Sequence, residues 1–127
     1  MKLGAYTACL HDRPLPEARA ILRSLGPESA EINSGGFIAE PHLPIADLQA
    51  SERARQDYLG IFAAAGITLT ALNGNGNPLS PDPAVRDKHS ADILRSIEIT
   101  ASLGSGGSSP CPGHLPPARP ERCRPGT

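Results

Sequence analysis

The chain has 127 residues, of which 39% are hydrophobic and 3% aromatic, and its formal net charge at pH 7 is −1. This length allows one domain at most, or part of one. A near-neutral charge argues against nucleic acid or an anionic membrane surface as the main partner, because both bind through an excess of Lys and Arg.

Two further features bear on where the protein works. The chain has no run of roughly 18 apolar residues and no signal-peptide pattern at its start, so the sequence predicts no membrane span and no secretion. Its three cysteines are Cys9, Cys111 and Cys123, an odd and widely spaced set that predicts neither a disulfide framework nor a metal clip. We therefore expect a cytoplasmic protein, with Cys9 as a small buried apolar residue.

The first third of the chain is typical of a strand, a helix and a second strand. Residues 2–8 form a short apolar run with strand character. Residues 13–26 follow with one apolar helix stripe, made of Ala18, Ile21, Leu22 and Leu25. Gly26 stands where a helix commonly ends in a left-handed conformation. The next strand is predicted over 29–33.

The same pattern continues with two more helices and one more strand. A helix is predicted over 46–65, with apolar positions Ala54, Tyr58, Ile61, Phe62 and Ala65. A strand follows over 67–73. Asp82 and Pro83 then predict the start of a third helix, which runs to about residue 104. Its apolar stripe is expected to be Ile93, Leu94, Ile97 and Ala101.

Strands that alternate with amphipathic helices predict an α/β fold with a parallel sheet and right-handed crossovers. We assign residues 1–104 to this unit. Residues 105–127 hold six of the fourteen prolines and one large aliphatic residue, which predicts a disordered tail. A G- and C-rich coding stretch read two bases later can encode an apolar strand here. We therefore interpret the tail as frameshifted, and the gene's bases around residue 105 test this.

In parallel α/β folds, functional residues gather at the carboxyl ends of the strands. The candidate substrate-binding residues at these ends are Tyr6, Glu31, Asn33, Asn73, Asn75 and Asn77. An amide can donate to or accept from a sugar hydroxyl, and a carboxylate can bind hydroxyls or assist proton transfer. Two alternatives remain open: the asparagines are ordinary turn formers, or Glu31 forms a structural salt bridge.

The histidines outside the tail do not predict a metal site. His11, His42 and His89 are far apart and match no local ligand motif. We expect surface or loop histidines, with His42 in a loop near the pocket and His89 on the exposed side of the third helix. The spacing of these histidines therefore predicts no metal-ligand motif.

Several segments resemble the start of bacterial sugar phosphate isomerase/epimerase proteins of the xylose isomerase-like TIM-barrel superfamily. These are "KLGAYTACLHDRPLPEA", "SAEINSGGF", "PHLPI", "AGITLTALNGNGNPLSPDP" and "KHSADILRSIEITASLG". The resemblance covers about residues 1–104. It implies a partial TIM (β/α)8 barrel, consisting of the first three βα units, because a complete barrel takes roughly 250 residues.

Family members of this kind bind a divalent metal (Mn, Co, Mg or Zn) and move a proton between adjacent carbons of a keto or aldo sugar. The resemblance places the metal ligands on later strands, so we expect this fragment to hold no cofactor and to be inactive. Glu31 and the asparagines match substrate-facing strand ends. The family often has His two residues after "NP", and this chain has Ser80 there. The expected partner of the full-length protein is a sugar or sugar phosphate. The fragment itself is expected to self-associate through its exposed sheet edges.

Two other functions were weighed. The chain could be a non-enzymatic small α/β interaction module whose Pro-rich tail binds a partner. It could also be an endonuclease-like member of the same barrel superfamily, which the near-neutral charge disfavours. A flavodoxin-like fold would need a first loop rich in glycine or in Ser and Thr. The corresponding segment here, "TACLHDRP", has neither composition.

Overall fold

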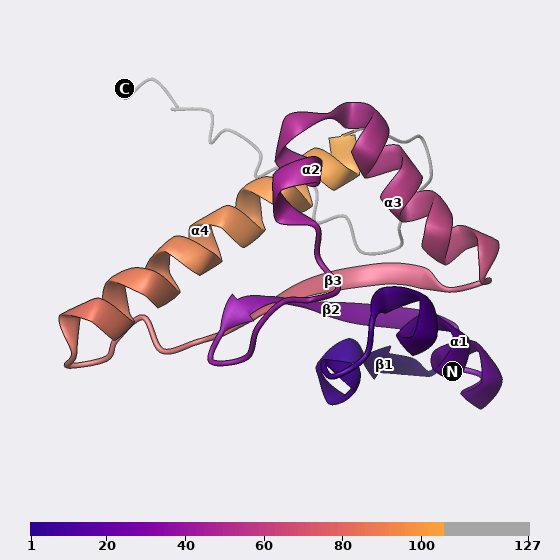
Figure 1. Ribbon diagram of the computed structural model, residues 1–127, viewed down its shortest axis with the longest axis horizontal. Helices are drawn as coiled ribbons and strands as arrows, with labels where there is room; N and C mark the ends of the chain where they lie inside the picture. The colour runs from indigo at the N-terminus through magenta and orange to yellow at the C-terminus, as the bar shows by residue number, and fades with distance from the viewer. Residues whose placement is uncertain (106–127) are drawn as a thin grey trace, which may run out of the picture.

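The computed structural model describes residues 1–105 as a three-stranded sheet accompanied by helices (Figure 1). In chain order the elements are β1 (Gly4–Tyr6), the 3-10 turn η1 (Thr7–Leu10), α1 (Leu15–Leu25), β2 (Ser29–Gly36), α2 (Ile45–Ala50), α3 (Glu52–Ala64), β3 (Thr68–Asn75) and α4 (Pro83–Ser105). The predictions of disorder and of a shifted reading frame concern residues 105–127. Apart from Ser105, which ends α4, these residues lie outside the described part of the chain.

The sheet is parallel, with the strand order β1-β2-β3. Its register places Tyr6 beside Glu31 and Asn33 beside Asn73. The predicted α/β class with parallel strands is therefore confirmed. A flavodoxin-like arrangement would place β1 between β2 and β3, so this strand order rules it out.

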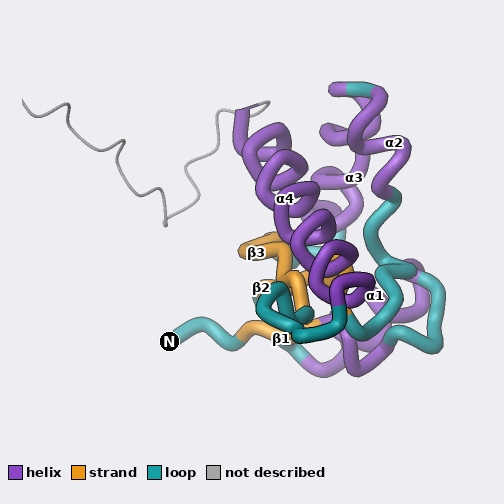
Figure 2. The backbone as a smooth tube through the Cα atoms, turned by 90° about the vertical axis from the view of Figure 1, so that its left-hand side faces the viewer, coloured by secondary structure: helices purple, strands orange, loops and turns teal. Residues whose placement is uncertain are grey.

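The helices gather on one face of the sheet. Figure 2 looks roughly along the strands, and in that view none of the helices of residues 1–105 lies to the left of the strands. Right-handed crossovers between neighbouring strands place the connecting helices on the same face. Ala30 and Ile32 of β2 are fully buried there, in one core with Leu48, Phe62 and Ile99. The opposite face, which we call the open face, carries the intervening residues of the strands.

Two helix boundaries follow directly from local chemistry. Gly26 ends α1 with φ 88, and its N–H donates to the Leu22 carbonyl at 3.1 Å. The prediction of one helix over 46–65 is wrong, because Ser51 adopts an extended conformation and divides α2 from α3. The Ser51 hydroxyl accepts a hydrogen bond from the Ala54 N–H at 3.2 Å and so begins α3 as its N-cap.

The predicted strands differ from the observed ones mainly at their carboxyl ends. β1 is shorter than the predicted 2–8, since the chain turns into η1 directly after Tyr6. Cys9 lies in that turn and is exposed, so its prediction as a buried apolar residue is wrong. β2 extends three residues beyond the predicted 29–33, to Gly36.

The prediction of the buried stripe of α4 is also wrong. Leu94 and Ile97 are 63% and 60% exposed. The buried positions are instead His89, Asp92, Ser96, Ile99 and Leu103. The N-terminal half of α4 faces main-chain groups at the ends of β2 and β3. Buried polar groups need hydrogen-bond partners, so this half turns its polar side inward.

Candidate functional site

Four polar side chains meet on the open face near the carboxyl ends of the three strands: Tyr6, Glu31, Asn33 and Asn73. We call them the open-face cluster. Asn73 Nδ2 donates to Glu31 Oε1 at 2.6 Å, and the Tyr6 hydroxyl donates to Asn33 Oδ1 at 2.9 Å. The parallel register explains the grouping, because neighbouring strands end at the same edge of the sheet.

The four members differ in what they can still offer a ligand. Asn33 Nδ2 donates to the carbonyls of Ile38 and Ala39, both at 3.0 Å, so its amide hydrogens are used to hold the loop after β2. Asn73 uses one amide hydrogen, and Glu31 accepts through one carboxylate oxygen. Glu31 Oε2 and Asn73 Oδ1 have no hydrogen bond within residues 1–105, so both can accept from hydroxyl groups.

The electrostatics of the cluster keep the Tyr6 phenol protonated. Burial raises the pKa of Tyr6 above its ordinary value of 10.0, and the negative charge of Glu31 raises it further. Glu31 itself is half-buried, and its recorded partner is the Asn73 amide rather than a Lys or Arg. The cluster therefore combines a carboxylate, an amide and a neutral phenol.

The other two candidate asparagines do not join this cluster. Asn77 Oδ1 accepts from the Leu79 N–H at 3.0 Å, which is the side-chain turn that asparagine commonly forms. Asn75 is exposed, and its carbonyl accepts from the Phe37 N–H at 2.7 Å. Their contacts in the structure thus shape the strand-end loops.

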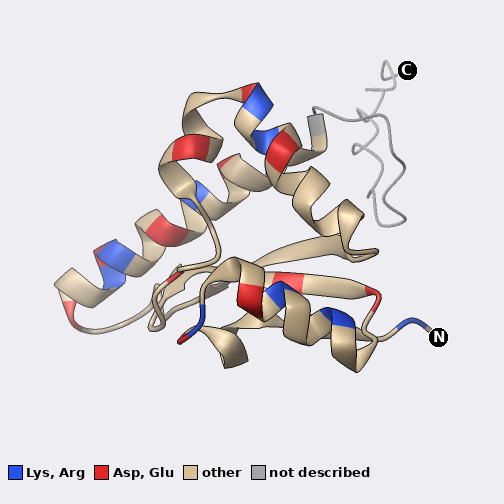
Figure 3. Ribbon diagram, turned by 45° about the vertical axis from the view of Figure 1, so that its right-hand side comes forward, with Lys and Arg blue, Asp and Glu red and all other residues tan. Residues whose placement is uncertain are grey.

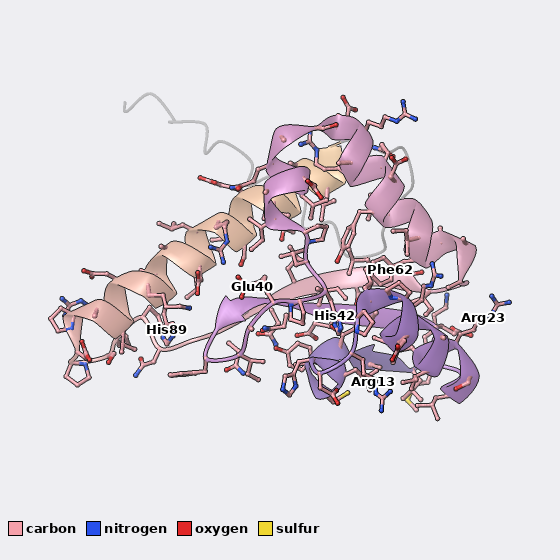
Figure 4. The ribbon with its side chains drawn as sticks, viewed as in Figure 1. Arg13, Arg23, Glu40, His42, Phe62 and His89 are labelled. Carbon is pink, nitrogen blue, oxygen red and sulfur yellow. The ribbon has the colours of Figure 1, made fainter. Side chains whose placement is uncertain are left out.

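A second polar group lies beneath the N-terminal half of α4. We call Lys88, His89, Asp92 and Arg95 the α4 brace. His89 was expected to be exposed, but it is 4% exposed, and Nδ1 accepts from the Asn77 N–H at 2.8 Å. Figure 4 shows this ring on the underside of α4. An accepting Nδ1 requires the neutral ring with its proton on Nε2. The ring also meets Phe37 edge-on, with centroids 4.5 Å apart.

Asp92 is the centre of the brace. Its Oδ2 accepts from the Gly36 N–H at 3.0 Å and from Lys88 Nζ at 2.7 Å, and Oδ1 pairs with Arg95 at 2.9 Å. Burial acts to raise the pKa of the Asp92 carboxyl. The hydrogen bonds from Lys88 and Gly36, together with the charges of Lys88 and Arg95, outweigh burial and hold that pKa below its ordinary value.

The brace ties the loop after β2 to the end of β3. Lys88 Nζ also donates to the Gly36 carbonyl at 3.0 Å. Gly36 has φ 104, and a Cβ at this position would collide with the Asn75 carbonyl oxygen. A glycine is therefore required where these two strand ends approach each other.

The sequence contains a signal for the brace that the apolar pattern obscured. The residues Lys88, His89, Asp92, Arg95 and Ser96 recur at one-helix-face spacing, in a helix whose apolar residues also show a stripe. A helix with one polar and one apolar stripe could bury either of them, so its sequence alone does not say which side is buried. Periodicity alone favours burial of the apolar stripe, and it therefore does not predict the α4 brace.

His42 is a structural residue in the described fold. It lies in the loop before α2, as predicted, but it is 3% exposed and therefore not a surface residue. Its Nε2 donates to the Arg13 carbonyl at 2.8 Å. Figure 4 labels both residues, which come from the loops before α2 and before α1. The Tyr58 hydroxyl donates to the His42 carbonyl at 2.9 Å, and burial raises the pKa of Tyr58.

The divalent metal implied by the family resemblance was tested against the residues present. Within residues 1–105, no three side chains of His, Cys, Asp or Glu are grouped so that they could hold a metal ion. The described residues therefore do not fit such a metal. Across the same residues, none of the helices combines the length and apolarity needed to cross a bilayer.

No family model matches the chain. A protein of Bacillus subtilis (strain 168), described as "Uncharacterized protein YfiH", is 32% identical over 105 residues. The match covers 82% of this chain and 33% of that protein. The chain thus spans about a third of the length of the curated relative that it matches.

Proposed function

We propose that the chain supplies the first three βα units of a sugar phosphate isomerase/epimerase barrel, including part of its substrate-binding surface. The observation that carries this proposal is the open-face cluster, in which the Glu31–Asn73 and Tyr6–Asn33 pairs meet at the strand ends. Active sites of (β/α)8 barrels form at this end of the strands. The sequential order β1-β2-β3 and the single helix-covered face are compatible with such a barrel.

The chemistry of the cluster suits a polyol. A sugar carries several hydroxyl groups, each a donor and an acceptor, so it needs partners of both kinds at close spacing. Glu31 accepts, the Asn73 amide can do either, and the Tyr6 phenol stays protonated. In this proposal Glu31 binds substrate hydroxyls or assists proton transfer, and Asn73 holds its carboxylate in one orientation.

The rest of the reaction requires residues from outside the described unit. A barrel needs eight strands, and residues 1–105 contain three. The relative from Bacillus subtilis is about three times as long as the matched region, which leaves room for such strands in a longer protein. We therefore expect the chain on its own to show no isomerase activity.

The experiment joins residues 1–104 of this chain to the part of YfiH that follows its matched region. The hybrid is incubated with a panel of aldoses, ketoses and their phosphates in heavy water, with Mn²⁺ supplied. Proton exchange through an enediol places deuterium on the carbon next to the carbonyl, which NMR detects. We expect incorporation with at least one sugar, and a loss of about 100-fold or more for Glu31→Gln and Asn73→Ala, as for removal of a general base or its orienting group.

The matched control is Asn75→Ala, which removes an exposed asparagine of the same strand outside the cluster. It should retain the activity of the parent hybrid. A folded hybrid that exchanges no hydrogen on any sugar, or an Asn75→Ala variant as impaired as Asn73→Ala, would remove the basis for the proposal.

The two other functions make different predictions. An endonuclease-like barrel needs a basic surface for phosphates, whereas Figure 3 shows acidic and basic residues interspersed along the helices. Gel-shift measurements with duplex DNA at low salt would detect such binding. If the chain is a non-enzymatic interaction module, the hybrid should be inactive. The chain should also still bind its partner when Glu31 is replaced.

A further inference from the structure

Asn33 connects the open-face cluster with residues 37–44, which we call the β2–α2 loop. The residue is 3% exposed, so it offers a ligand almost no surface. On one side its Oδ1 accepts from the Tyr6 hydroxyl at 2.9 Å. On the other side its Nδ2 donates to the Ile38 and Ala39 carbonyls, both at 3.0 Å. Asn33 therefore meets the site through Tyr6 and the loop through its amide nitrogen.

The chemistry of these partners allows only one orientation of the Asn33 amide. Carbonyl oxygens accept hydrogen bonds and cannot donate them, so the NH₂ group must face Ile38 and Ala39. The amide oxygen must then face Tyr6, and the Tyr6 hydroxyl must be the donor. Its one proton is committed to Asn33, which leaves the lone pairs of its oxygen for a ligand. Tyr6 is thus set to accept from a substrate hydroxyl.

We propose that Asn33 is a positioning residue that couples the Tyr6 hydroxyl to the β2–α2 loop. While Tyr6 donates to Oδ1, both amide hydrogens of Asn33 remain available to the loop carbonyls. When Tyr6 loses that proton, two acceptors face each other, and the amide has to turn its NH₂ group toward Tyr6. This turn withdraws both hydrogens from Ile38 and Ala39 and so releases that part of the loop.

The coupling determines which groups of a substrate Tyr6 can bind, and this consequence rests on the proposed function. A sugar hydroxyl that donates to Tyr6 extends the chain of hydrogen bonds to Asn33 and strengthens it, because linked hydrogen bonds polarise one another. A group that only accepts, such as a carbonyl or phosphate oxygen, would have to take the Tyr6 proton away from Asn33. The pair thus selects a hydroxyl group at this point of the site and keeps the loop fixed when one is bound.

The β2–α2 loop has two further attachments, one on either side of residues 38–39. The Phe37 N–H donates to the Asn75 carbonyl at 2.7 Å, and Glu40 pairs with Arg95 of α4 at 3.7 Å. Neither attachment involves the open-face cluster, so both persist when the amide turns. The change is therefore expected at residues 38–39, while the rest of the chain serves as an internal reference.

The test follows the Ile38 and Ala39 carbonyls by carbon-detected NMR in the complete 127-residue chain, without any ligand. Tyr58→Phe leaves Tyr6 as the one phenol of the chain, and Cys9→Ser removes the thiol that donates to the Tyr6 carbonyl at 3.1 Å. Tyrosine is supplied as fluorotyrosine, which ionises closer to neutral pH and reports its own ionisation through its fluorine signal. We expect both carbonyl signals to move with the same midpoint as the phenol.

Other titratable groups in the surrounding elements could also move these signals. They are Glu31 on β2, Cys9 and His11 of the η1 turn, and Glu40 and His42 in the loop, whereas β3 contributes none. Tyr6→Phe retains every one of them apart from the thiol already replaced, and it removes only the hydroxyl. The response of the two carbonyls should therefore disappear in Tyr6→Phe.

Asn33→Ala is the variant that tests the coupling itself. Its phenol should still ionise, but the Ile38 and Ala39 carbonyls should no longer follow. Asn77→Ala is the matched control, because the Asn77 amide forms a local turn with the Leu79 N–H outside the cluster, and it should leave the response intact.

Three outcomes would overturn the proposal. The first is that the Ile38 and Ala39 carbonyl signals stay fixed while the phenol ionises. The second is an unchanged response in Asn33→Ala. The third is a simultaneous shift of the Ile61 carbonyl, which accepts from Arg19 at 3.2 Å, because ionisation would then be unfolding the chain rather than releasing the loop.

A second measurement tests the link to substrate in the hybrid with YfiH. Tyr6→Phe and Asn33→Ala should each slow deuterium incorporation by about tenfold, as for the loss of one hydrogen bond. The double variant should be no slower than Asn33→Ala, because the two residues act as one unit. Additive losses would contradict the coupling. An inactive hybrid beside a responding loop would reject the proposed function alone, so the two failures are distinguishable.

Discussion

Glu31 and His89 show how a single partner determines what a polar residue does in this molecule. Glu31 is held by the Asn73 amide at 2.6 Å, and its charge acts on the nearby Tyr6 phenol. His89 is buried because the Asn77 N–H requires an acceptor. In both cases the partner lies on another element.

Replacing Glu31 by Gln tests its electrostatic role. Burial and the Glu31 charge both raise the pKa of Tyr6, and burial is the larger cause. Glu31→Gln should therefore lower the pKa of Tyr6 without returning it to 10.0. The measurement is a phenolate titration by ultraviolet absorbance in a Tyr58→Phe background, since the chain has two tyrosines. Glu28→Gln, at an exposed acid that pairs with Lys2 at 4.0 Å, serves as the control and should leave the titration unchanged.

Replacing His89 tests the acceptor role of its ring. His89→Leu leaves the Asn77 N–H without its partner, so the free energy of unfolding should fall by about 1–3 kcal/mol. His89→Asn offers Oδ1 near the position of Nδ1 and should recover part of the loss. Urea unfolding measures both, and hydrogen exchange of the Asn77 amide locates the effect. A His89→Leu variant as stable as the parent would show that the hydrogen bond contributes nothing.

At the level of elements, α4 joins segments that are far apart in the chain. Asp92 receives the Gly36 N–H across a sequence separation of 56 residues. The hydroxyls of Ser96 and Ser34 form a hydrogen bond at 2.7 Å, and further along the helix Ile99 and Leu103 enter the apolar core. α4 is thus polar where it meets the strand ends and apolar where it meets the helices and sheet.

This arrangement predicts how stability depends on pH. The native pKa of Asp92 lies below its ordinary value, so the charged carboxylate contributes stability above the unfolded pKa of about 3.9. That contribution is lost as the pH falls through the native pKa. Asp92→Asn should cost about 2 kcal/mol at neutral pH, and its difference from the parent should shrink in acid.

Urea unfolding at a series of pH values measures this difference. Asp87→Asn is the control, because the Asp87 side chain is 77% exposed and pairs only with Arg86 at the surface. It should be nearly neutral at every pH. If the difference between Asp92→Asn and the parent persists unchanged below the native pKa, the carboxylate is not the source of the stability.

At the scale of the whole molecule, the described unit is a sheet with one covered face and two edges. The covered face holds the apolar core, and the open face holds the polar cluster. A closed barrel would have no edges, whereas within residues 1–105 the β3 strand pairs with β2 alone.

The same view predicts the response to metal ions. In the proposed barrel the metal ligands lie on later strands, so we expect the chain alone to show no tight one-to-one binding of Mn²⁺ or Co²⁺. Isothermal titration measures this, and a chelator should leave the thermal unfolding midpoint unchanged. Tight one-to-one binding would contradict both this expectation and the assignment of the metal ligands to later strands.

Much of the fold could be predicted from the sequence because the relevant signals are local. Helix stripes, Gly26 after α1 and Pro83 at the start of α4 all act within a few residues, and they placed strands and helices in the right order. The parallel sheet follows from that order. Residues at the ends of parallel strands must share one edge, so the grouping of Glu31 with Asn73 could be anticipated.

The sequence by itself thus determined the alternation of elements and the edge of the sheet where polar side chains collect. Only the tertiary structure decided that Ser51 divides a predicted helix, that α4 turns His89 and Asp92 inward, and that Leu94 and Ile97 face outward. The physical reason is that α4 has a polar and an apolar stripe, and it buries the stripe whose hydrogen-bonding or packing partners lie opposite it in the fold. Those partners, the Gly36 and Asn77 N–H groups, are brought to α4 by the packing of the chain.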